Sequence, residues 1–151
     1  MGKYTFLGFF LIIALMLITG FVVNHSSNTV NMQEIDTGIQ TAVLGTMRDN
    51  ADTNAYGMRA KDVVATITKE VADRQTDSKK TVVIDYKFYS DEEGKTPIAY
   101  NTAITNNSVI KSVQYRVKLY NTKDLNADYT IKSGAQAEST TENRIVLNKA
   151  D

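Results

Sequence analysis

The longest apolar run of the chain lies near its amino terminus, over residues 4–23. Sixteen of these twenty residues are apolar, and no formally charged side chain occurs between Lys3 and Glu34. A helix of twenty residues rises about 30 Å, which matches the hydrocarbon thickness of a bilayer. The pattern therefore predicts a transmembrane helix over residues 4–23.

A cleaved secretory signal is the alternative interpretation of the same run. Such signals have an apolar core of about 7–15 residues, a basic start and a small-x-small cleavage site. Here the basic start is Lys3 alone, and no Ala-x-Ala follows the core within residues 19–24. Retention of the segment is favoured over cleavage after the core.

Flanking charge predicts the orientation of this span. Lys3 and the α-amino group precede it, whereas the next basic residue after it is Arg48. Because positively charged flanks stay in the cytoplasm, we expect residues 1–3 to be cytoplasmic and the chain from about Asn24 onward to be extracytoplasmic. The prediction is a single-pass protein of the cell membrane with an exported body.

Two helical patterns follow within residues 24–75, the juxtamembrane and amphipathic region. In the first, apolar residues recur every three or four positions, with Asp36 and Gln40 among the polar residues of the opposite side. Its apolar set is Val30, Met32, Ile35, Ile39, Ala42, Val43 and Met47. The second pattern starts at Met58, ends near residues 73–75, and has the apolar positions Val63, Val64, Ile67 and Val71.

Small residues mark a candidate helix-packing and assembly face on the first helix. Gly38, Ala42 and Gly45 lie on neighbouring turns, close to Ile35 and Ile39. Small side chains let helix backbones approach closely, so these five residues are expected to contact a neighbouring helix. A glycine that ends the helix early is equally compatible with the pattern.

From residue 81 the hydrophobic period changes to two, which is typical of strands with one buried face. Residues 82–88 predict one strand, and residues 96–100 predict a weaker one in which Pro97 indicates an edge or a strand start. Residues 101–107 are expected to be a polar connection. Residues 109–120 predict the second strong strand, whose inward side chains are Val113, Tyr115, Val117 and Leu119.

The order of these elements indicates the fold class. Helices come first, and the strands within residues 80–148 are joined by hairpin-length connections, which favours an antiparallel β-sheet. The expected fold is α+β, with an N-terminal transmembrane helix that continues into an amphipathic helix and a second helix packed on a small sheet. Toward the carboxyl end, only residues 145–147 are expected to be well buried.

Composition narrows the classes of function. Lys and Arg number 17 and Asp and Glu number 17, so no net positive field exists that would recruit nucleic acid. The chain has no Cys and one His, His25, and it lacks the usual nucleophile, metal-protease and phosphate-loop motifs. We therefore predict a protein that is not an enzyme and holds no cofactor.

One acidic segment is a candidate calcium site. Asp124, Asn126 and Asp128 place oxygen ligands at alternate positions, as the start of an EF-hand loop does. Tyr129 replaces the turn glycine of that loop, and Ala135 stands where its bidentate glutamate would be. A polar turn without a metal explains the same residues, and it is the favoured interpretation.

The layout of the chain resembles that of a known family. An apolar helical half that runs into an amphipathic half and then into a small antiparallel sheet is similar to type IV pilins and to the pseudopilins of tight-adherence systems. Gly8 followed by Phe9 resembles the leader-cleavage junction of that family. The family's glutamate, five residues into the mature protein, corresponds here to Ile13, which argues against a major-subunit role.

The resemblance implies a non-enzymatic structural subunit of a surface filament or pilus-like assembly. In that role the chain would associate with copies of itself, or with related subunits, through its N-terminal helix in the membrane. The alternative is a single-pass membrane-anchored extracytoplasmic domain that binds a partner within a secretion, conjugation or envelope complex.

Overall fold

The computed structural model describes residues 32–47 and 57–147. Residues 32–47 form a helix, here called helix 32–47. The following elements come, in chain order, as β1 Met58–Arg59, α2 Ala60–Arg74, β2 Lys80–Tyr89, β3 Pro97–Ile98, α3 Tyr100–Thr105, β4 Val109–Ile110, β5 Ser112–Asn121, the 3₁₀ turn η1 Thr122–Asp124, and β6 Ser139–Val146.

The main sheet has four antiparallel strands in the order β3-β2-β5-β6. β2 and β5 pair along their whole length, from Lys80 opposite Asn121 to Tyr89 opposite Ser112. β6 then pairs with β5 from Ser139 opposite Leu119 to Val146 opposite Ser112. The predicted edge position of Pro97 is confirmed, because β3 is an outer strand of this sheet.

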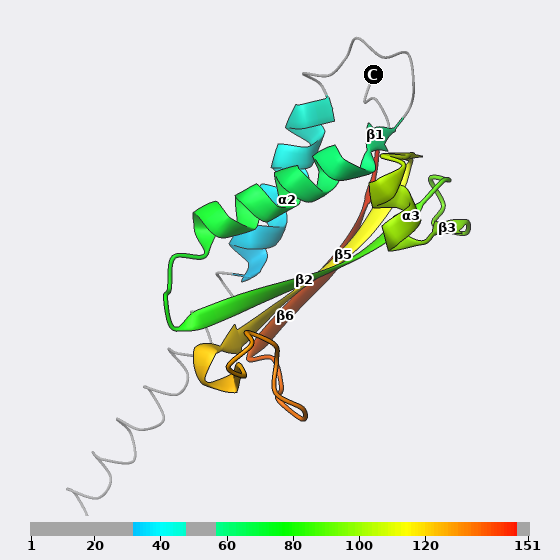
Figure 1. The fold of residues 1–151 in the computed structure, drawn as a ribbon. Helices are drawn as coiled ribbons and strands as arrows, with labels where there is room; N and C mark the ends of the chain where they lie inside the picture. The colour runs from blue at the N-terminus through cyan, green and yellow to red at the C-terminus, as the bar shows by residue number, and fades with distance from the viewer. Residues whose placement is uncertain (1–31, 48–56, 148–151) are drawn as a thin grey trace, which may run out of the picture.

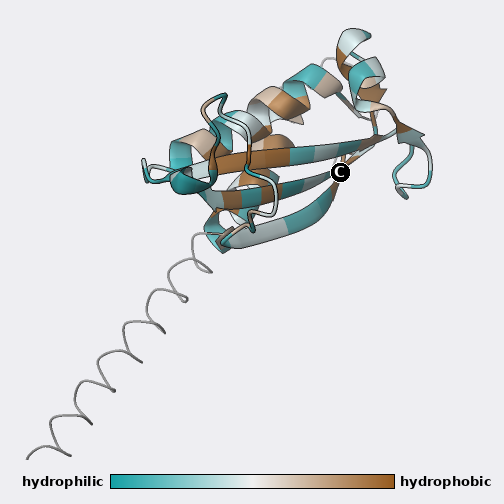
Figure 2. Cartoon of the chain, turned by 60° about the horizontal axis from the view of Figure 1, so that its bottom comes forward, coloured by the Kyte–Doolittle hydropathy of each residue, from teal (hydrophilic) through white to brown (hydrophobic). Residues whose placement is uncertain are grey.

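Helix 32–47 and α2 lie side by side over one face of the sheet (Figure 1). The core lies between these helices and the strands, and the hydrophobic segments of both layers face one another there (Figure 2). Its members from these two helices are Met32, Ile35, Ile39, Val43, Ala60, Val63, Ile67 and Val71. The α+β class, with helices packed on a small antiparallel sheet, is thereby confirmed.

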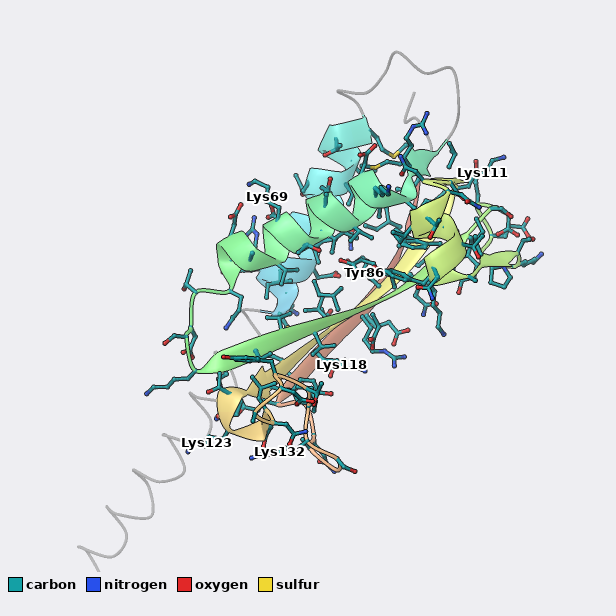
Figure 3. The ribbon with its side chains drawn as sticks, viewed as in Figure 1. Lys69, Tyr86, Lys111, Lys118, Lys123 and Lys132 are labelled. Carbon is teal, nitrogen blue, oxygen red and sulfur yellow. The ribbon has the colours of Figure 1, made fainter. Side chains whose placement is uncertain are left out.

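The two faces of the sheet differ as the alternation predicts. Val113, Tyr115, Val117 and Leu119 of β5 are buried against the helices. Figure 3 shows Tyr86 of β2 on the helical side and Lys118 of β5 on the other side, where Lys118 pairs with Asp85 at 2.7 Å. Charged side chains thus occupy the face that the helices leave uncovered.

Three local predictions are wrong. Residues 101–107 do not form a plain connection, because α3 begins at Tyr100 and buries Ala103. The Tyr100 ring stacks on Phe88 at 5.6 Å between centroids, which holds this short helix on β2. Met58 belongs to β1 rather than to the second helix, and β1 pairs with β4 in a separate two-stranded sheet.

The strand predicted over residues 109–120 is also divided. Lys111 interrupts it, since its N–H donates to Tyr89 at 2.9 Å while its carbonyl accepts from Leu147 at 2.8 Å. One residue thus bonds to both neighbouring strands, which lets β4 leave the main sheet. β5 continues from Ser112.

The predicted membrane span, residues 4–23, lies outside the described residues, as do residues 1–3 and the junction of Gly8 and Phe9. The helices that the structure does describe are too short or too polar to cross a membrane. The juxtamembrane residues 24–31 and the turn residues 48–56 are likewise outside the description.

Candidate functional site

The junction between helix 32–47 and the sheet contains a carboxylate among apolar contacts. Ile35, Ile39 and Val43 are almost wholly buried on the inner side of the helix. Asp36 follows Ile35, and its side chain reaches the strands beneath. The helix is therefore attached to the sheet by apolar burial and by one polar group.

Three side chains donate hydrogen bonds to the Asp36 carboxylate. The Tyr115 hydroxyl of β5 donates to Oδ1, and the Asn143 amide of β6 donates to Oδ2 at 3.1 Å. Gln40, one turn further along the helix, donates to Oδ2 at 3.2 Å. Hydrogen bonds to an ionised acceptor are stronger than neutral ones, so this group, here called the Asp36 clamp, joins the helix to two strands.

Tyr115 is wholly enclosed, and its environment favours the neutral hydroxyl. Burial raises the pKa of Tyr115 well above its usual range, and the hydrogen bond to the nearby Asp36 carboxylate raises it further. The phenol therefore remains a hydrogen-bond donor at any physiological pH. This chemistry is that of a structural attachment rather than of proton transfer.

The sequence pattern placed Asp36 and Gln40 on the polar side of the helix, and that placement is wrong. Asp36 lies at the border of the apolar stripe, one position after Ile35. Tyr115 and Asn143 are direct partners on β5 and β6, with polar ends on the inner face. This inward-facing polar pair becomes visible only with the register of β5 and β6, so the sequence alone did not show that the covering helix supplies a polar partner.

The structure places the five candidate assembly residues in different environments. Ile35 and Ile39 belong to the domain's own core. Gly38 is buried as well, and a side chain there would meet Arg74 and Glu70 of α2. Since these three residues pack within the chain, they offer no surface to a second subunit in this fold, whereas Ala42 and Gly45 remain half-exposed.

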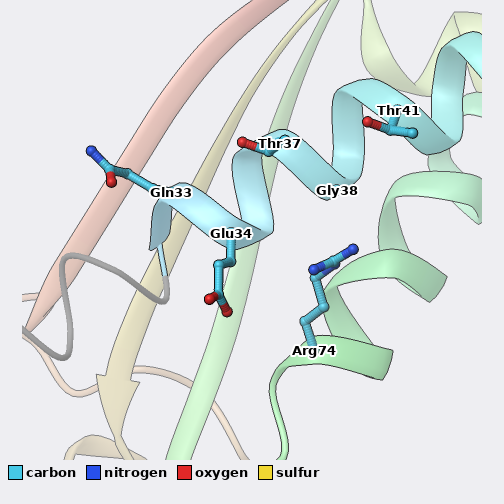
Figure 4. Close-up of a pocket in the computed structure, with 6 residues that line it drawn as sticks. All are labelled: Gln33, Glu34, Thr37, Gly38, Thr41 and Arg74. Carbon is cyan, nitrogen blue, oxygen red and sulfur yellow. The ribbon is translucent and has the colours of Figure 1, made fainter.

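A shallow hollow of about 320 Å³ lies where helix 32–47 passes the end of α2 (Figure 4). Arg74 extends from α2 toward Gly38, and it is already paired with Glu70. The remaining lining residues are Gln33, Glu34, Thr37 and Thr41 of helix 32–47. The Arg74 and Glu70 side chains already occupy the space that a side chain at Gly38 would take, so the cation beside the hollow has its partner within α2.

The candidate calcium residues lie in the turn between β5 and β6. Asp128 accepts from the Thr130 hydroxyl at 2.7 Å, which lowers the pKa of this carboxyl, and Asn126 donates to the same hydroxyl at 3.1 Å. Asp124 ends η1. Across residues 32–47 and 57–147, His, Cys, Asp and Glu side chains form no group of three or more suited to a metal ion.

Comparison with known proteins gives no family for the chain. No protein-family model matches it, and no curated protein or solved structure matches it.

Proposed function

We propose that this protein is a non-enzymatic, pilin-like structural subunit of a surface filament. In this proposal residues 4–23 span the membrane in the precursor, with residues 1–3 in the cytoplasm and the α+β domain outside. Cleavage after Gly8 then leaves residues 9–23 as the membrane helix of the mature subunit. The observation that supports it is the docking of helix 32–47, whose inner side belongs to the domain core and whose Asp36 is bound by two strands.

That docking has a mechanical consequence. Any load on the chain before residue 32 enters the domain through helix 32–47, and from there it passes into β5 and β6 through the Asp36 clamp. A subunit anchored by one N-terminal helix requires such a joint, because a loosely tethered domain would not hold a fixed position in an assembly.

The proposal includes self-association through the N-terminal segment. Residues 4–33 contain no Lys, Arg, Asp or Glu, so a helix formed by them could pack in an apolar bundle without burying a formal charge. Beyond it, Ala42 and Gly45 are half-exposed and lie three positions apart on helix 32–47, and Leu44 is 38% exposed. These three residues are the remaining candidates for a contact above the membrane.

Mechanical shearing of native cells tests this function. The account expects the full chain to appear in a sedimentable filament fraction, and it expects Ala42→Leu to lower that yield without lowering the melting temperature. Lys69→Leu, which places the same side chain on the exposed side of α2, is the matched control and should assemble normally. A chain that stays wholly in the membrane fraction at normal abundance would instead support the anchored binding domain.

A further inference from the structure

β6 forms one outer strand of the main sheet. Its inner neighbour is β5, with eight consecutive residue pairs and no bulge between them. In the part of the chain that the structure describes, no strand pairs with the other side of β6. The backbone of this outer side is therefore a candidate for pairing with another strand.

Several of the usual protections of an edge strand are absent from β6 itself. Natural proteins guard such edges with proline, lysine, bulges or very short strands. The sequence of β6, STTENRIV, contains neither proline nor lysine. The opposite outer strand, β3, shows the contrast, because it has only two residues and begins with Pro97.

The hydrogen-bonding pattern shows which residues face outward. Leu147, directly after β6, donates its N–H to the Lys111 carbonyl at 2.8 Å, toward β5. Because successive residues of an antiparallel strand bond to opposite sides, the odd-numbered residues of β6 bond to β5. The backbone groups of residues 140, 142, 144 and 146 are left on the outer edge.

Two of these outward-bonding residues carry opposite charges. Glu142 and Arg144 are exposed, two positions apart, on the face of the sheet away from the helices. Arg116 of β5 pairs with Glu142 at 2.7 Å, and Arg144 donates to the Glu92 carbonyl at 3.0 Å. Both side chains are thus held on that face by contacts within the chain.

This spacing is complementary to itself. If two β6 strands pair antiparallel about Asn143, Glu142 of each copy lies opposite Arg144 of the other, so two attractive pairs form. Moving the centre to Glu142 or to Arg144 would instead bring like charges together, which is destabilising. Only the first of these three registers satisfies both charges.

We propose that β6 pairs with β6 of a second copy of this chain, antiparallel and centred on Asn143. The two-fold axis of such a pair is perpendicular to the sheet, so the two copies of helix 32–47 run in opposite directions. The contact therefore joins domains that face one another, as on two filaments or two cell surfaces. It goes beyond the filament proposal and is independent of packing through residues 4–23.

Disulfide crosslinking of the full-length chain in detergent micelles tests this register, because the native chain has no cysteine. Residues 142 and 144 of the two copies would form a hydrogen-bonded pair with Cα atoms about 5.5 Å apart, within disulfide range. Two copies of residue 142 would lie on a diagonal of about 7–8 Å. A mixture of Glu142→Cys and Arg144→Cys chains should therefore give about ten-fold more covalent dimer than either variant alone.

Other crosslinking outcomes overturn the proposal. Equal dimer yields from the single variants and the mixture would show an unspecific collision. β3 pairs with β2 only at Phe88 and Tyr89, so the rest of β2 has an outer edge of its own. Efficient crosslinking of Glu142→Cys with Lys87→Cys would show head-to-tail pairing of β6 with that edge. A monomer at all concentrations would show that the edge does not pair, and would leave filament formation in the shearing experiment unaffected.

Charge exchange provides the second test, with the size of the native dimer as readout. Glu142→Arg places arginines opposite each other, and Arg144→Glu places glutamates opposite each other, so each should raise the dimer dissociation constant about ten-fold. The double exchange restores opposite charges and should restore dimerisation. Circular dichroism of each variant confirms the fold, and a double exchange that folds but stays monomeric would overturn the proposal.

Discussion

Asp36 is the residue at which the helical layer and the sheet are joined by polar contacts. Its carboxylate accepts hydrogen bonds from Tyr115 of β5, from Asn143 of β6 and from Gln40 of the next turn of helix 32–47. A carboxylate near a core is costly unless its acceptors are satisfied. The three donors meet that cost and, in doing so, fix the rotation of helix 32–47 relative to β5 and β6.

Removal of this carboxylate should destabilise the fold mainly because the Tyr115 hydroxyl loses its hydrogen-bond acceptor. Asp36→Ala leaves the enclosed Tyr115 hydroxyl without its acceptor, so the free energy of unfolding should fall by about 1–3 kcal/mol. Denaturant titration measures the change. In an Asp36→Ala, Tyr115→Phe double variant the loss should be smaller than the sum of the two single losses, and strict additivity would show that the two groups do not interact.

Ionisation of Tyr115 makes the free energy of unfolding depend on pH in the alkaline range. Its pKa is raised in the folded state by burial and by Asp36, so the folded chain holds this proton more tightly than the unfolded chain. The contribution is complete below about pH 10, the pKa of an ordinary tyrosine, and is lost as pH rises above it.

Tyr115→Phe isolates this contribution. Burial raises the pKa of Tyr86 too, so the wild type and the variant should both lose stability at high pH. Above pH 10 the wild-type curve should be steeper by about 1.4 kcal/mol per pH unit, which corresponds to one proton. Parallel curves from denaturant titrations between pH 9 and 11 would contradict the assigned environment of Tyr115.

The limit of sequence reasoning at this scale is visible at the same residues. Alternation along β5 correctly predicted that Tyr115 points inward, because strand periodicity is strict. Asp36 could not be placed, since a helical position at the border of a stripe is rotated inward or outward only by its tertiary partners. Those partners lie 79 and 107 residues away along the chain.

At the scale of elements, the two glycines of helix 32–47 should respond in opposite ways to a side chain. Gly45 has open space around it, so Gly45→Ala should raise the free energy of unfolding by about 0.5–1 kcal/mol through helix propensity. Gly38→Leu must displace the Arg74 and Glu70 side chains of α2, so it should lower the free energy of unfolding. Thermal melts of both variants measure these changes. A stabilising effect of Gly38→Leu would mean that α2 does not pack against helix 32–47 at Gly38.

The apolar stripe of α2 should carry more of the stability than its charged side. Ile67 is fully buried, and Ile67→Ala should cost about 2–5 kcal/mol by creating a cavity beneath the helix. Lys69 is exposed and pairs only with Asp73 on the same helix, so Lys69→Ala should leave the melting temperature unchanged. Similar effects of the two changes would show that the stripe has been assigned to the wrong face.

Elements with strong periodicity were predictable, and short elements were not. α2, β2 and β5 have enough apolar repeats to specify their type and their buried face. α3 depends on the stacking of Tyr100 on Phe88, and β1 depends on pairing with β4 some fifty residues later. Such elements form because of tertiary contacts, so a local pattern cannot reveal them.

At the scale of the whole molecule, the docked helix 32–47 follows a long apolar segment of the chain. We propose that residues 9–23 remain attached to the domain and serve as its membrane anchor and assembly helix. Helix 32–47 itself is docked on the sheet, and Met32 at its described start belongs to the core.

Mass spectrometry of the amino-terminal peptide of the native protein tests that claim most directly. The pilin-like account predicts a mature chain that begins at Phe9, after cleavage of the leader at Gly8. A chain that retains Met1 would favour the anchored binding domain over the filament subunit. A native amino terminus at or beyond Asn24 would contradict the account, because no anchor and no assembly helix would remain on the domain.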